Sequence, residues 1–558
     1  MRKFACGIFL SLTLLFSCKN SGNPEAQPAE KGNAEEPRIV NIINFVRLLE
    51  PRIEQFTEDV LYQTVVEQVK IMRQYKLKGT FLLQYDALMD PRYQQLMKSL
   101  PRDTFEIGAW WEIPQPLVEN AGMKWRGRYP WDWHANVGFT TGYTPEEREK
   151  LADVYMNDFK KIFGYYPESV GCWFIDAHSL DYLYDNYNIK ASCMCRDQIG
   201  TDGYTIWGGY WNQAYFPSRI NSYMPAQTEE KQLPVPVFRM LGSDPVRQYD
   251  KGTPPGEQGV ITLEPVYRYG GGDSTWVHWF FREFVNGESL EFNYVQAGQE
   301  NSFTWNRMAK GYKIQMPLIA KLRDENRVTV ETLGESGKWF TEKFRTTPAT
   351  SMTVSRDLDT GNMKTAWFNS RFYRANLLWQ DNNLRIRDIH LFDEDLPTFT
   401  TTGVLNTTYS EFFTLPFVDG YRWSTKDFTA GMRFKAVIGG KDVLLEGSDP
   451  EFTEKTDGTL TISWPLTNIQ ATLTITLDEK NMSFELSDGK IKWYLDLQTA
   501  ETAELPFLNI TDKRIDCSFQ DLEYHVDAEK GSFAKASGNN FRVNPENGLI
   551  VLNMAERE

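Results

Sequence analysis

Cysteine and histidine are scarce in this chain. Only six cysteines and five histidines occur among its 558 residues. Cys6 and Cys18 belong to the N-terminal segment, and too few cysteines follow for a disulfide-stapled scaffold. Cys193 and Cys195 lie close together, but no histidine or further cysteine follows them at the spacing of a metal site. Either one of them pairs with Cys172, or all remain buried free thiols.

Basic residues are fewer than acidic ones in this chain. The chain has 60 Lys and Arg against 75 Asp and Glu, a formal net charge of -15 at pH 7. A nucleic-acid-binding surface needs clustered basic side chains to neutralise phosphates. We therefore expect no nucleic acid partner.

Long apolar runs are also missing. The apolar stretch from Gly7 to Phe16 follows Arg2 and Lys3, a pattern typical of a secretory signal and too short to span a membrane as a helix. The segment ends in Leu-Phe-Ser-Cys at Cys18, which resembles a bacterial lipobox; a plain signal peptide is the alternative. We expect a signal at 1–17, a lipid on Cys18, a flexible tether over 18–37 and a location in the cell envelope, periplasmic or at the outer-membrane surface.

What the chain does contain, over residues 38–347, is a regular alternation of strand-like and helix-like segments. Short apolar runs such as RIVNIINF and KGTFLLQ alternate with amphipathic stretches, which predicts parallel strands joined by helices. Several of these strands end in a carboxylate, and a closed ring would bring such ends together. We therefore predict a (β/α)7 or (β/α)8-type barrel whose strand ends carry these acidic groups: Glu112, Asp176, Asp244, Glu264 and Glu300.

The rhythm changes after Thr346, Thr347 and Pro348. Short alternating runs such as TLTISW, ATLTITL and MSFEL are separated by turn residues. This pattern predicts an all-β, sandwich-like domain over 348–558.

Four motifs in the first domain carry a family resemblance. They are GTFLLQYD, FEIGAW, GCWFIDAHSL and VTVETLGESGKWF. Residues 38–345 resemble the divergent (β/α)-barrel superfamily that unites polysaccharide deacetylases with alpha-mannosidase and amylopullulanase-like glycoside hydrolases. The whole chain is similar to a two-domain lipoprotein family of Bacteroidetes.

The chain departs from that superfamily where metal would bind. Deacetylases carry paired Asp residues after the first strand and a His-x-x-x-His pair after the third, whereas these places hold NFVRLL and EIGAWWEI. The His and Asp that bind zinc at the first strand of alpha-mannosidases are absent too. We therefore expect no metal and no other cofactor.

The resemblance assigns candidate catalytic residues. Asp176 occupies the position of the nucleophile in the mannosidase and amylopullulanase groups, although it is equally placed to cap the following helix. Hydrolysis of a glycosidic bond needs a second carboxyl group. Glu300 is our preferred general acid, with Glu264 and Asp244 as rivals, and Glu335 is either a site residue or a helix cap.

A second set of residues has the chemistry to hold a sugar. Flat aromatic rings stack on sugar faces, polar groups fix orientation, and the long aromatic insertion after the third strand is of a length that usually builds a site. The predicted substrate-binding residues are Trp111, Glu112, Asp132, His134, His178, Trp207, Arg219, Asn221, Asp244 and Glu335; Trp131, Trp133 and Trp211 are further stacking candidates.

These inferences favour a lipid-anchored glycoside hydrolase that acts on an oligo- or polysaccharide through paired carboxylates. Two alternatives stay open. One is a metal-dependent carbohydrate deacetylase with rearranged ligands, and the other is a glycan-binding lipoprotein without catalysis.

Overall fold

The computed structural model describes residues 36–248, 261–398, 403–538 and 540–555. The predicted signal peptide, Cys18 and nearly all of the tether lie outside these residues. Residues 36–558 form one compact unit by their internal contacts, so the predicted boundary between 347 and 348 stays a prediction. None of the described helices has the length and apolar content needed to cross a membrane.

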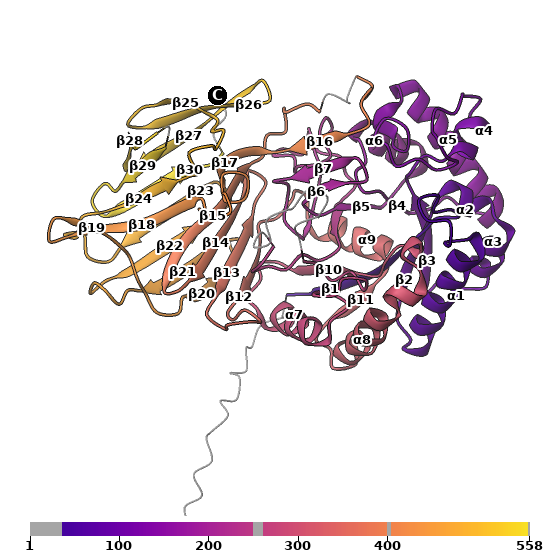
Figure 1. Cartoon of the computed structure of the whole chain (residues 1–558), viewed down its shortest axis with the longest axis horizontal. Coiled ribbons are helices and arrows are strands. Elements are labelled where there is room, and N and C mark those ends of the chain that lie inside the picture. Colours follow the sequence, from indigo (N-terminus) through magenta and orange to yellow (C-terminus); the bar gives the residue numbers. More distant parts are fainter. Residues whose placement is uncertain (1–35, 249–260, 399–402, 539, 556–558) are drawn as a thin grey trace, which may run out of the picture. The chain divides into compact units, whose positions relative to one another are not determined.

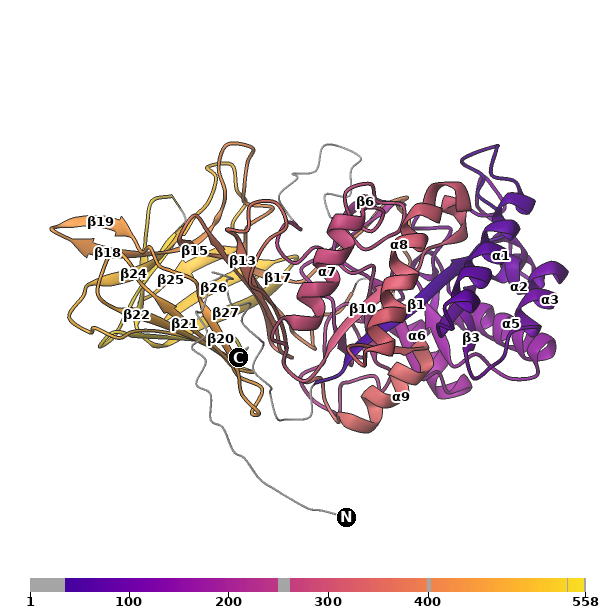
Figure 2. The same ribbon diagram turned by 90° about the horizontal axis from the view of Figure 1, so that it is seen from below.

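The first half of the chain forms a nearly closed barrel sheet (Figures 1 and 2). The strand order is β10-β1-β2-β3-β4-β5-β9-β8, with β11 also paired to β1. All these pairings are parallel except that of β8 with β9, and β9 and β10 contact each other across the remaining gap. The strands are β1 (Arg38–Val46), β2 (Gly79–Leu83), β3 (Phe105–Trp110), β4 (Ser169–Gly171), β5 (Ala191–Cys195), β8 (Ala214–Tyr215), β9 (Val237–Met240), β10 (Asn293–Ala297) and β11 (Thr329–Glu331).

Helices surround these strands (Figure 1). Their ends follow local sequence signals: Thr144 and Glu147 form a capping box at the start of α5, and Gly164 ends it in the left-handed conformation. The helices are α1 (Glu58–Gln74), α2 (Tyr85–Met89), α3 (Pro91–Lys98), α4 (Gln115–Asn120), α5 (Pro145–Phe163), α6 (Ala177–Tyr187), α7 (Ser274–Asn286), α8 (Trp305–Asp324) and α9 (Leu333–Lys343), with short 3-10 turns η1 (Thr140–Gly142) and η2 (Asn301–Phe303).

Two large antiparallel sheets make up the second half. The ten-stranded sheet contains β12 (Thr350–Val354), β13 (Lys364–Asn369), β14 (Tyr373–Gln380), β15 (Asn383–Leu391), β17 (Leu415–Asp419), β18 (Gly431–Ile438), β19 (Lys441–Leu444), β24 (Trp493–Gln498), β28 (Ser532–Lys535) and β29 (Phe541–Asn544). The eight-stranded sheet contains β20 (Glu451–Glu454), β21 (Leu460–Pro465), β22 (Thr472–Leu477), β23 (Asn481–Leu486), β25 (Phe507–Ile510), β26 (Arg514–Phe519), β27 (Leu522–Lys530) and β30 (Leu549–Asn553). The ring centroids of Phe434 in the ten-stranded sheet and Phe484 in the eight-stranded sheet lie 5.5 Å apart, so the two sheets pack face to face as in a sandwich. The predicted fold class, a barrel followed by a β-sandwich-like part, is confirmed.

Segments of the two halves also pair directly. A three-stranded sheet joins β6 (Gln198–Thr201) and β7 (Tyr204–Trp207), which follow the barrel strand β5, to β16 (Ser410–Phe413) from the second half. Trp211 stacks on Trp367 of β13 with ring centroids 4.3 Å apart. The four described cysteines are buried and free, in agreement with the free-thiol alternative.

One glycine fixes the turn that follows β10. Gly298 has a φ of 102°, and a Cβ placed on it would lie 2.1 Å from the carbonyl oxygen of Ile43 in β1. The close approach of these two backbones positions the following residues, Gln299 and Glu300. A side chain at Gly298 therefore meets both backbone strain and a clash.

We expect Gly298→Ala to lower the free energy of unfolding by more than about 3 kcal/mol, because strain and clash add. Gly164→Ala is the matched control, since Gly164 has a φ of 85° with open space around it and carries the strain alone, about 1 to 2 kcal/mol. Denaturant unfolding of both variants measures the difference. Equal losses would show that β1 does not confine Gly298.

Candidate active site around Arg47

Arg47 is the centre of the group of charged residues at the carboxyl ends of the barrel strands. It follows β1, and its side chain is fully buried. Its guanidinium donates two hydrogen bonds to Glu112, which follows β3, at 2.8 and 2.5 Å. It also forms an ion pair of 3.1 Å with Glu300, which follows β10. One cation thus holds two carboxylates from strands far apart in the sequence.

Neighbouring polar groups fix this arrangement. Gln84, at the end of β2, donates to Glu112 at 2.7 Å. The Asn301 side chain accepts a hydrogen bond from the backbone N–H of Arg47 and donates to its carbonyl oxygen, at 2.9 and 2.8 Å. Backbone and side chain of Arg47 are therefore both held, which leaves the guanidinium little freedom.

Burial gives the two acidic partners of Arg47 different surroundings. Glu112 accepts from Arg47 and Gln84, so its carboxylate charge is compensated. Burial raises the pKa of Glu300 from 4.5 to about 7, against the opposing effect of Arg47, with Asp202 and Glu112 raising it further. Burial also raises the pKa of Asp86, at the end of β2, to about 7. The cluster therefore combines Glu112, which accepts three hydrogen bonds, with two carboxyl groups whose pKa is raised to about 7 by burial.

The aromatic insertion covers this cluster on its outer side. The Arg47 guanidinium lies 4.0 Å from the ring centroid of Trp131. Arg52, whose side chain is 30% exposed, reaches over Trp131 and Trp133 at 5.2 and 5.0 Å. Tyr129 is exposed and stacks on Trp133 at 5.8 Å. Trp131 of the insertion thus packs on Arg47, and exposed Tyr129 and partly exposed Arg52 lie beside Trp133.

Asp132 and His134 belong to this insertion. Asp132 accepts hydrogen bonds from Arg128, and although burial raises its pKa, these bonds lower it to about 2. The Nδ1 atom of His134 lies 3.7 Å from Asp132. Both residues flank Trp133 in the sequence and follow Trp131, whose ring lies over Arg47; their role in a site stays a prediction.

Glu264 borders the same cluster. Its carboxylate accepts hydrogen bonds from Thr262 at 2.8 Å and from Gln299 at 3.2 Å. Gln299 is the residue before Glu300. Arg196 lies 3.7 Å from Glu264. Of the predicted catalytic residues, Glu300 thus shares Arg47 with Glu112, and Glu264 contacts the residue before Glu300 in the chain.

Asp176 lies in a different network. The strand predicted to run to Ile175 ends at Gly171, and Asp176 follows at the start of α6. One of its oxygens accepts from Arg148 at 2.9 Å and from the Ser179 backbone at 2.9 Å. The other accepts from the hydroxyls of Thr140 and Ser179 at 2.5 and 2.7 Å.

These bonds give Asp176 the capping position that we had considered as an alternative. Burial raises the pKa of Asp176, but Arg148 and the hydroxyl donors more than offset this, and the pKa is lowered below its usual value. No contact joins Asp176 to Glu300, Glu264 or Glu112 within the described residues. β4 ends early and Asp176 caps α6, which supports the capping alternative. That Asp176 shares a site with these glutamates stays a prediction.

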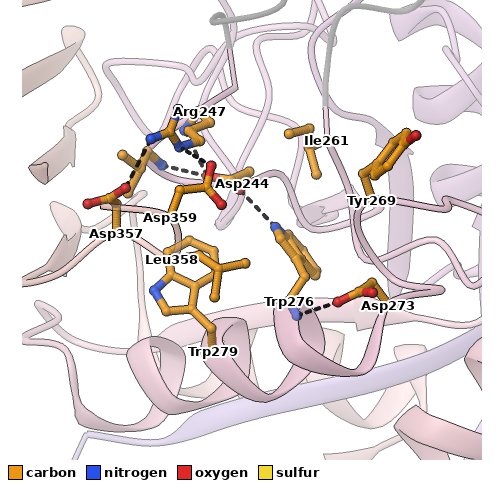
Figure 3. Close-up of a pocket in the computed structure, with 11 residues that line it drawn as sticks. Asp244, Arg247, Ile261, Tyr269, Asp273, Trp276, Trp279, Asp357, Leu358 and Asp359 are labelled. Carbon is orange, nitrogen blue, oxygen red and sulfur yellow. Dashed lines mark hydrogen bonds and ion pairs between the residues drawn. The ribbon is translucent and has the colours of Figure 1, made fainter. Parts of the chain in front are cut away.

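Asp244 also lies apart, in a cavity of about 460 Å³ (Figure 3). Its carboxylate accepts from the backbone of Val246 and Arg247 and from the indole N–H of Trp276. Asp357, another wall residue, pairs with Arg247 at 3.0 Å. Trp276 and Trp279 give this cavity aromatic walls, so Asp244 can serve a binding surface there, but it is not a rival to Glu300 as the acid of the Arg47 cluster.

Glu335 lies at the opposite end of the strands. It forms a capping box with Thr332 at the start of α9 and pairs with Lys78, which precedes β2. It also lines a surface hollow with Phe105, at the beginning of β3. Its place at the amino ends of the strands is set by β11, which pairs with the first half of β1. Glu335 is a helix cap and does not join the other carboxylates.

The remaining predicted substrate-binding residues are spread over the molecule. His178 on α6 pairs with Glu149 on α5, and Arg219 pairs with Asp181 on α6. These side-chain partners, and the ones named next for the buried residues, lie outside the Arg47 cluster. Asn221 bonds to Leu396, Trp207 donates to Asp419, and Trp111 packs edge-on against Tyr155 in the core; Trp211, as noted, stacks on Trp367.

Sequence reasoning missed the cation that organises the site. Arg47 stands in the NFVRLL segment, which we considered only for the metal ligands that it lacks. The missed neighbours are Gln84, Asp86 and Asp202. The signal for Arg47 was its place directly after an apolar strand, the same position that marked the acidic residues.

We expect Asp176→Asn to lower the free energy of unfolding by about 3 to 5 kcal/mol, because it leaves the buried charge of Arg148 without its partner. Asp181→Asn is the control: it breaks a half-exposed ion pair and costs about 0 to 1 kcal/mol. Because the pKa of Asp176 is lowered in the folded state, its contribution is present above the unfolded pKa of about 4 and is lost as the pH falls through the folded value. A fully stable Asp176→Asn variant would contradict this structural role.

Comparisons with known proteins give only remote likenesses. No protein-family model matches the chain, and no curated protein sequence does. A protein of Parabacteroides distasonis, provisionally assigned as a glycoside hydrolase/deacetylase, is 16% identical with a TM-score of 0.48, over 68% of this chain and 91% of that one. The 4-alpha-glucanotransferase of Thermococcus litoralis is 10% identical with a TM-score of 0.25, over 93% of this chain and 99% of that one. At these values the likenesses carry no argument about activity, which has to come from the site itself.

Proposed function

We propose that this protein is a carbohydrate-active enzyme that hydrolyses glycosidic bonds, with Glu300 as the general acid and Glu112 as the ionised partner. The observation that carries the proposal is the pair of carboxyl groups on one buried guanidinium: Glu112 accepts two hydrogen bonds from Arg47, and Glu300 lies 3.1 Å from it with its pKa raised to about 7. A glycosidase needs one protonated and one ionised carboxyl group, about 5 to 9.5 Å apart. Because Glu112 and Glu300 contact the same guanidinium, their carboxyl groups lie closer together than the upper limit of this range.

The surroundings of the pair support a sugar as substrate. Tyr129 and Trp133 form a stacked aromatic pair beside Arg52 and Arg128, and such flat rings with polar neighbours suit the faces and hydroxyls of a sugar. We assign Asp132 and His134 to substrate orientation on the same side. Glu264 supports the acid through Gln299 and has no direct contact with Arg47.

A second candidate function is glycan binding without catalysis. One observation favours it: Arg47 lies between the two carboxylates and is itself fully buried, so a sugar has to enter from the side of Arg52 and Trp133 to reach both. Binding on the aromatic insertion alone would need no such access. In either case we propose a location in the cell envelope with the lipid on Cys18.

We expect Glu300→Gln to lose glycan hydrolysis by at least about 100-fold, because the glutamine cannot donate a proton to the leaving group. Release of reducing sugar from a panel of oligo- and polysaccharides measures this. Glu335→Gln, at the opposite end of the strands, is the matched control and should keep full activity. Unchanged hydrolysis by Glu300→Gln would remove Glu300 as the acid, and binding by calorimetry with no product from the wild type would select the binding function.

The pH profile gives a separate test of the acid. Because the pKa of Glu300 is raised to about 7, hydrolysis should decline as the pH rises above 7 and the proton is lost. Glu264→Gln should lower the rate but leave the pH of this decline nearly unchanged, because Glu264 acts on the acid only through Gln299. A rate that keeps rising to pH 9 would contradict a carboxylic acid as proton donor.

A further inference from the structure

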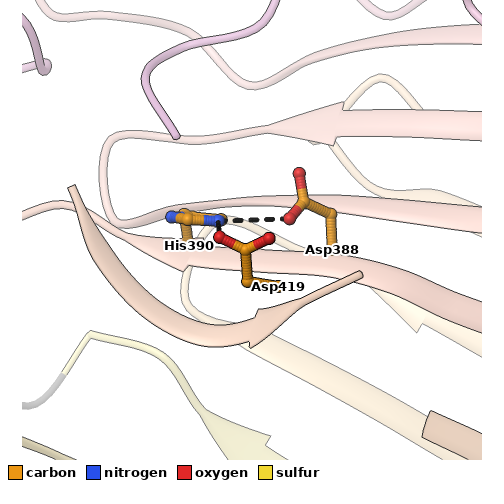
Figure 4. A group of neighbouring side chains, drawn as sticks. All are labelled: Asp388, His390 and Asp419. Carbon is orange, nitrogen blue, oxygen red and sulfur yellow. Dashed lines mark ion pairs between the residues drawn. The ribbon is translucent and has the colours of Figure 1, made fainter. Parts of the chain in front are cut away.

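A compact group of potential metal ligands lies in the second half of the chain, away from the Arg47 cluster (Figure 4). It consists of Asp388 and His390 on β15 and Asp419 at the end of β17. One ligand atom from each residue lies within 4.8 Å of the others, and all three residues are buried. The Nε2 atom of His390 is 3.1 Å from Asp388 and 3.6 Å from Asp419.

The hydrogen bonds of Thr414 fix which nitrogen of His390 carries the proton. The Thr414 hydroxyl donates to the carbonyl oxygen of Gly208 at 2.6 Å. Its oxygen therefore accepts from His390 Nδ1, 3.1 Å away. In the neutral imidazole Nε2 then bears the lone pair, and it is 2% exposed with no hydrogen bond of normal geometry. A lone pair aimed at two carboxylates is unfavourable unless a cation lies between them.

Each carboxylate accepts hydrogen bonds from other groups and directs one oxygen toward His390. Oδ2 of Asp388 accepts a hydrogen bond from Arg374 at 2.6 Å, and Oδ1 of Asp388 is its atom nearest to Nε2 of His390. Asp419 receives the backbone N–H groups of Tyr421 and Arg422 on Oδ1. The other oxygen of Asp419, Oδ2, faces His390 and is oriented by the indole N–H of Trp207 at 3.1 Å. The three ligand atoms are thus held by separate outer partners, as in protein metal sites.

The balance of buried charge around the group leaves room for a cation. Arg374 bridges Asp388 and Asp197, and Arg239 lies 3.4 Å from Asp197. Asp419 is a further buried acidic side chain beside His390. Buried carboxylates are stabilised by a positive charge next to them. A cation or a proton at Nε2 of His390 would supply that charge, and the metal content of the protein distinguishes the two.

We propose that Asp388, His390 and Asp419 bind one divalent transition-metal cation, with Zn²⁺ as its representative. Nitrogen and oxygen ligands lie about 2.0 to 2.2 Å from zinc, which places them roughly 3.3 to 3.6 Å from each other in a tetrahedral site. Of the two separations from Nε2, 3.6 Å falls in this range and 3.1 Å is slightly shorter. One imidazole and two carboxylates suit Zn²⁺ or Mn²⁺ and disfavour Cu(I), which prefers sulfur ligands.

The ion would tie β15 to β17 and, through Trp207, to β7 from the first half of the chain. Because its ligands are 0 to 2% exposed, it enters as the chain folds, and its binding free energy adds to the stability of the fold. Its role is structural, and it takes no part in the chemistry proposed at Glu300.

Metal content of the untagged protein, expressed in metal-supplemented medium and purified without chelator, tests the proposal first. We expect about one transition-metal ion per chain in the wild type and a loss to background in His390→Gln. His525→Gln is the matched control, since His525 is also buried and faces a carboxylate, Asp527, at 3.8 Å, and it should keep the metal. No bound metal in the wild type, or equal metal in His390→Gln, would overturn the site.

Refolding of the wild type gives a readout that does not depend on a folded variant. Protein unfolded with EDTA and refolded with Zn²⁺ should melt more than about 3 °C above protein refolded with EDTA present. Refolding with Co²⁺ should give visible absorption bands of a tetrahedral N/O site. Identical melting in both refolded samples and no cobalt bands would mean that a proton on His390, and not a metal, balances the two carboxylates.

Discussion

The buried ion pairs of Arg47 are the constraint on which the barrel end of this molecule depends. A guanidinium taken out of water loses several kcal/mol of hydration, which only well-placed anions can offset. Glu112 accepts two hydrogen bonds from the guanidinium, and Glu300 places a carboxyl oxygen 3.1 Å from it. Burial lowers the pKa of Arg47, but its acidic neighbours together raise it more. The strands β1, β3 and β10 must therefore end at a common level for the fold to tolerate this charge. The same requirement brings two carboxyl groups together in a form that can do acid–base chemistry.

The other charged networks show how one fold separates structural from functional acids. Asp176 is surrounded by four donor atoms and the charge of Arg148, so it stays ionised and holds α6 in place. Glu300 has a single cation and a buried environment, so it retains its proton to higher pH. The difference between them is the number of donors, and it decides which carboxyl group can act as an acid near neutral pH.

Sequence patterns predicted the alternation of strands and helices, the change to antiparallel sheets and the acidic residues after the strands. They placed Glu112 and Glu300 at one end of the barrel because parallel strands share a direction, and both contact Arg47. They left open whether Asp176 and Glu335 cap helices, because this depends on where β4 stops and on which half of β1 pairs with β11. Arg47 was missed because arginine is not a metal ligand. Its partners, Glu112 and Glu300, follow strands that are distant in the sequence, so the ion pairs are seen only in the folded structure.

The account depends on Glu300 being a protonated buried carboxyl group at neutral pH. Difference infrared spectroscopy of the wild type against Glu300→Gln measures this directly, through the carbonyl band of the protonated acid. We predict a Glu300 band that persists at pH 6 and disappears with a midpoint near pH 7. A band that is already lost by pH 5, with a midpoint near the ordinary value of 4.5, would show that Glu300 is a plain ion-pair partner of Arg47 and would contradict the proposed acid.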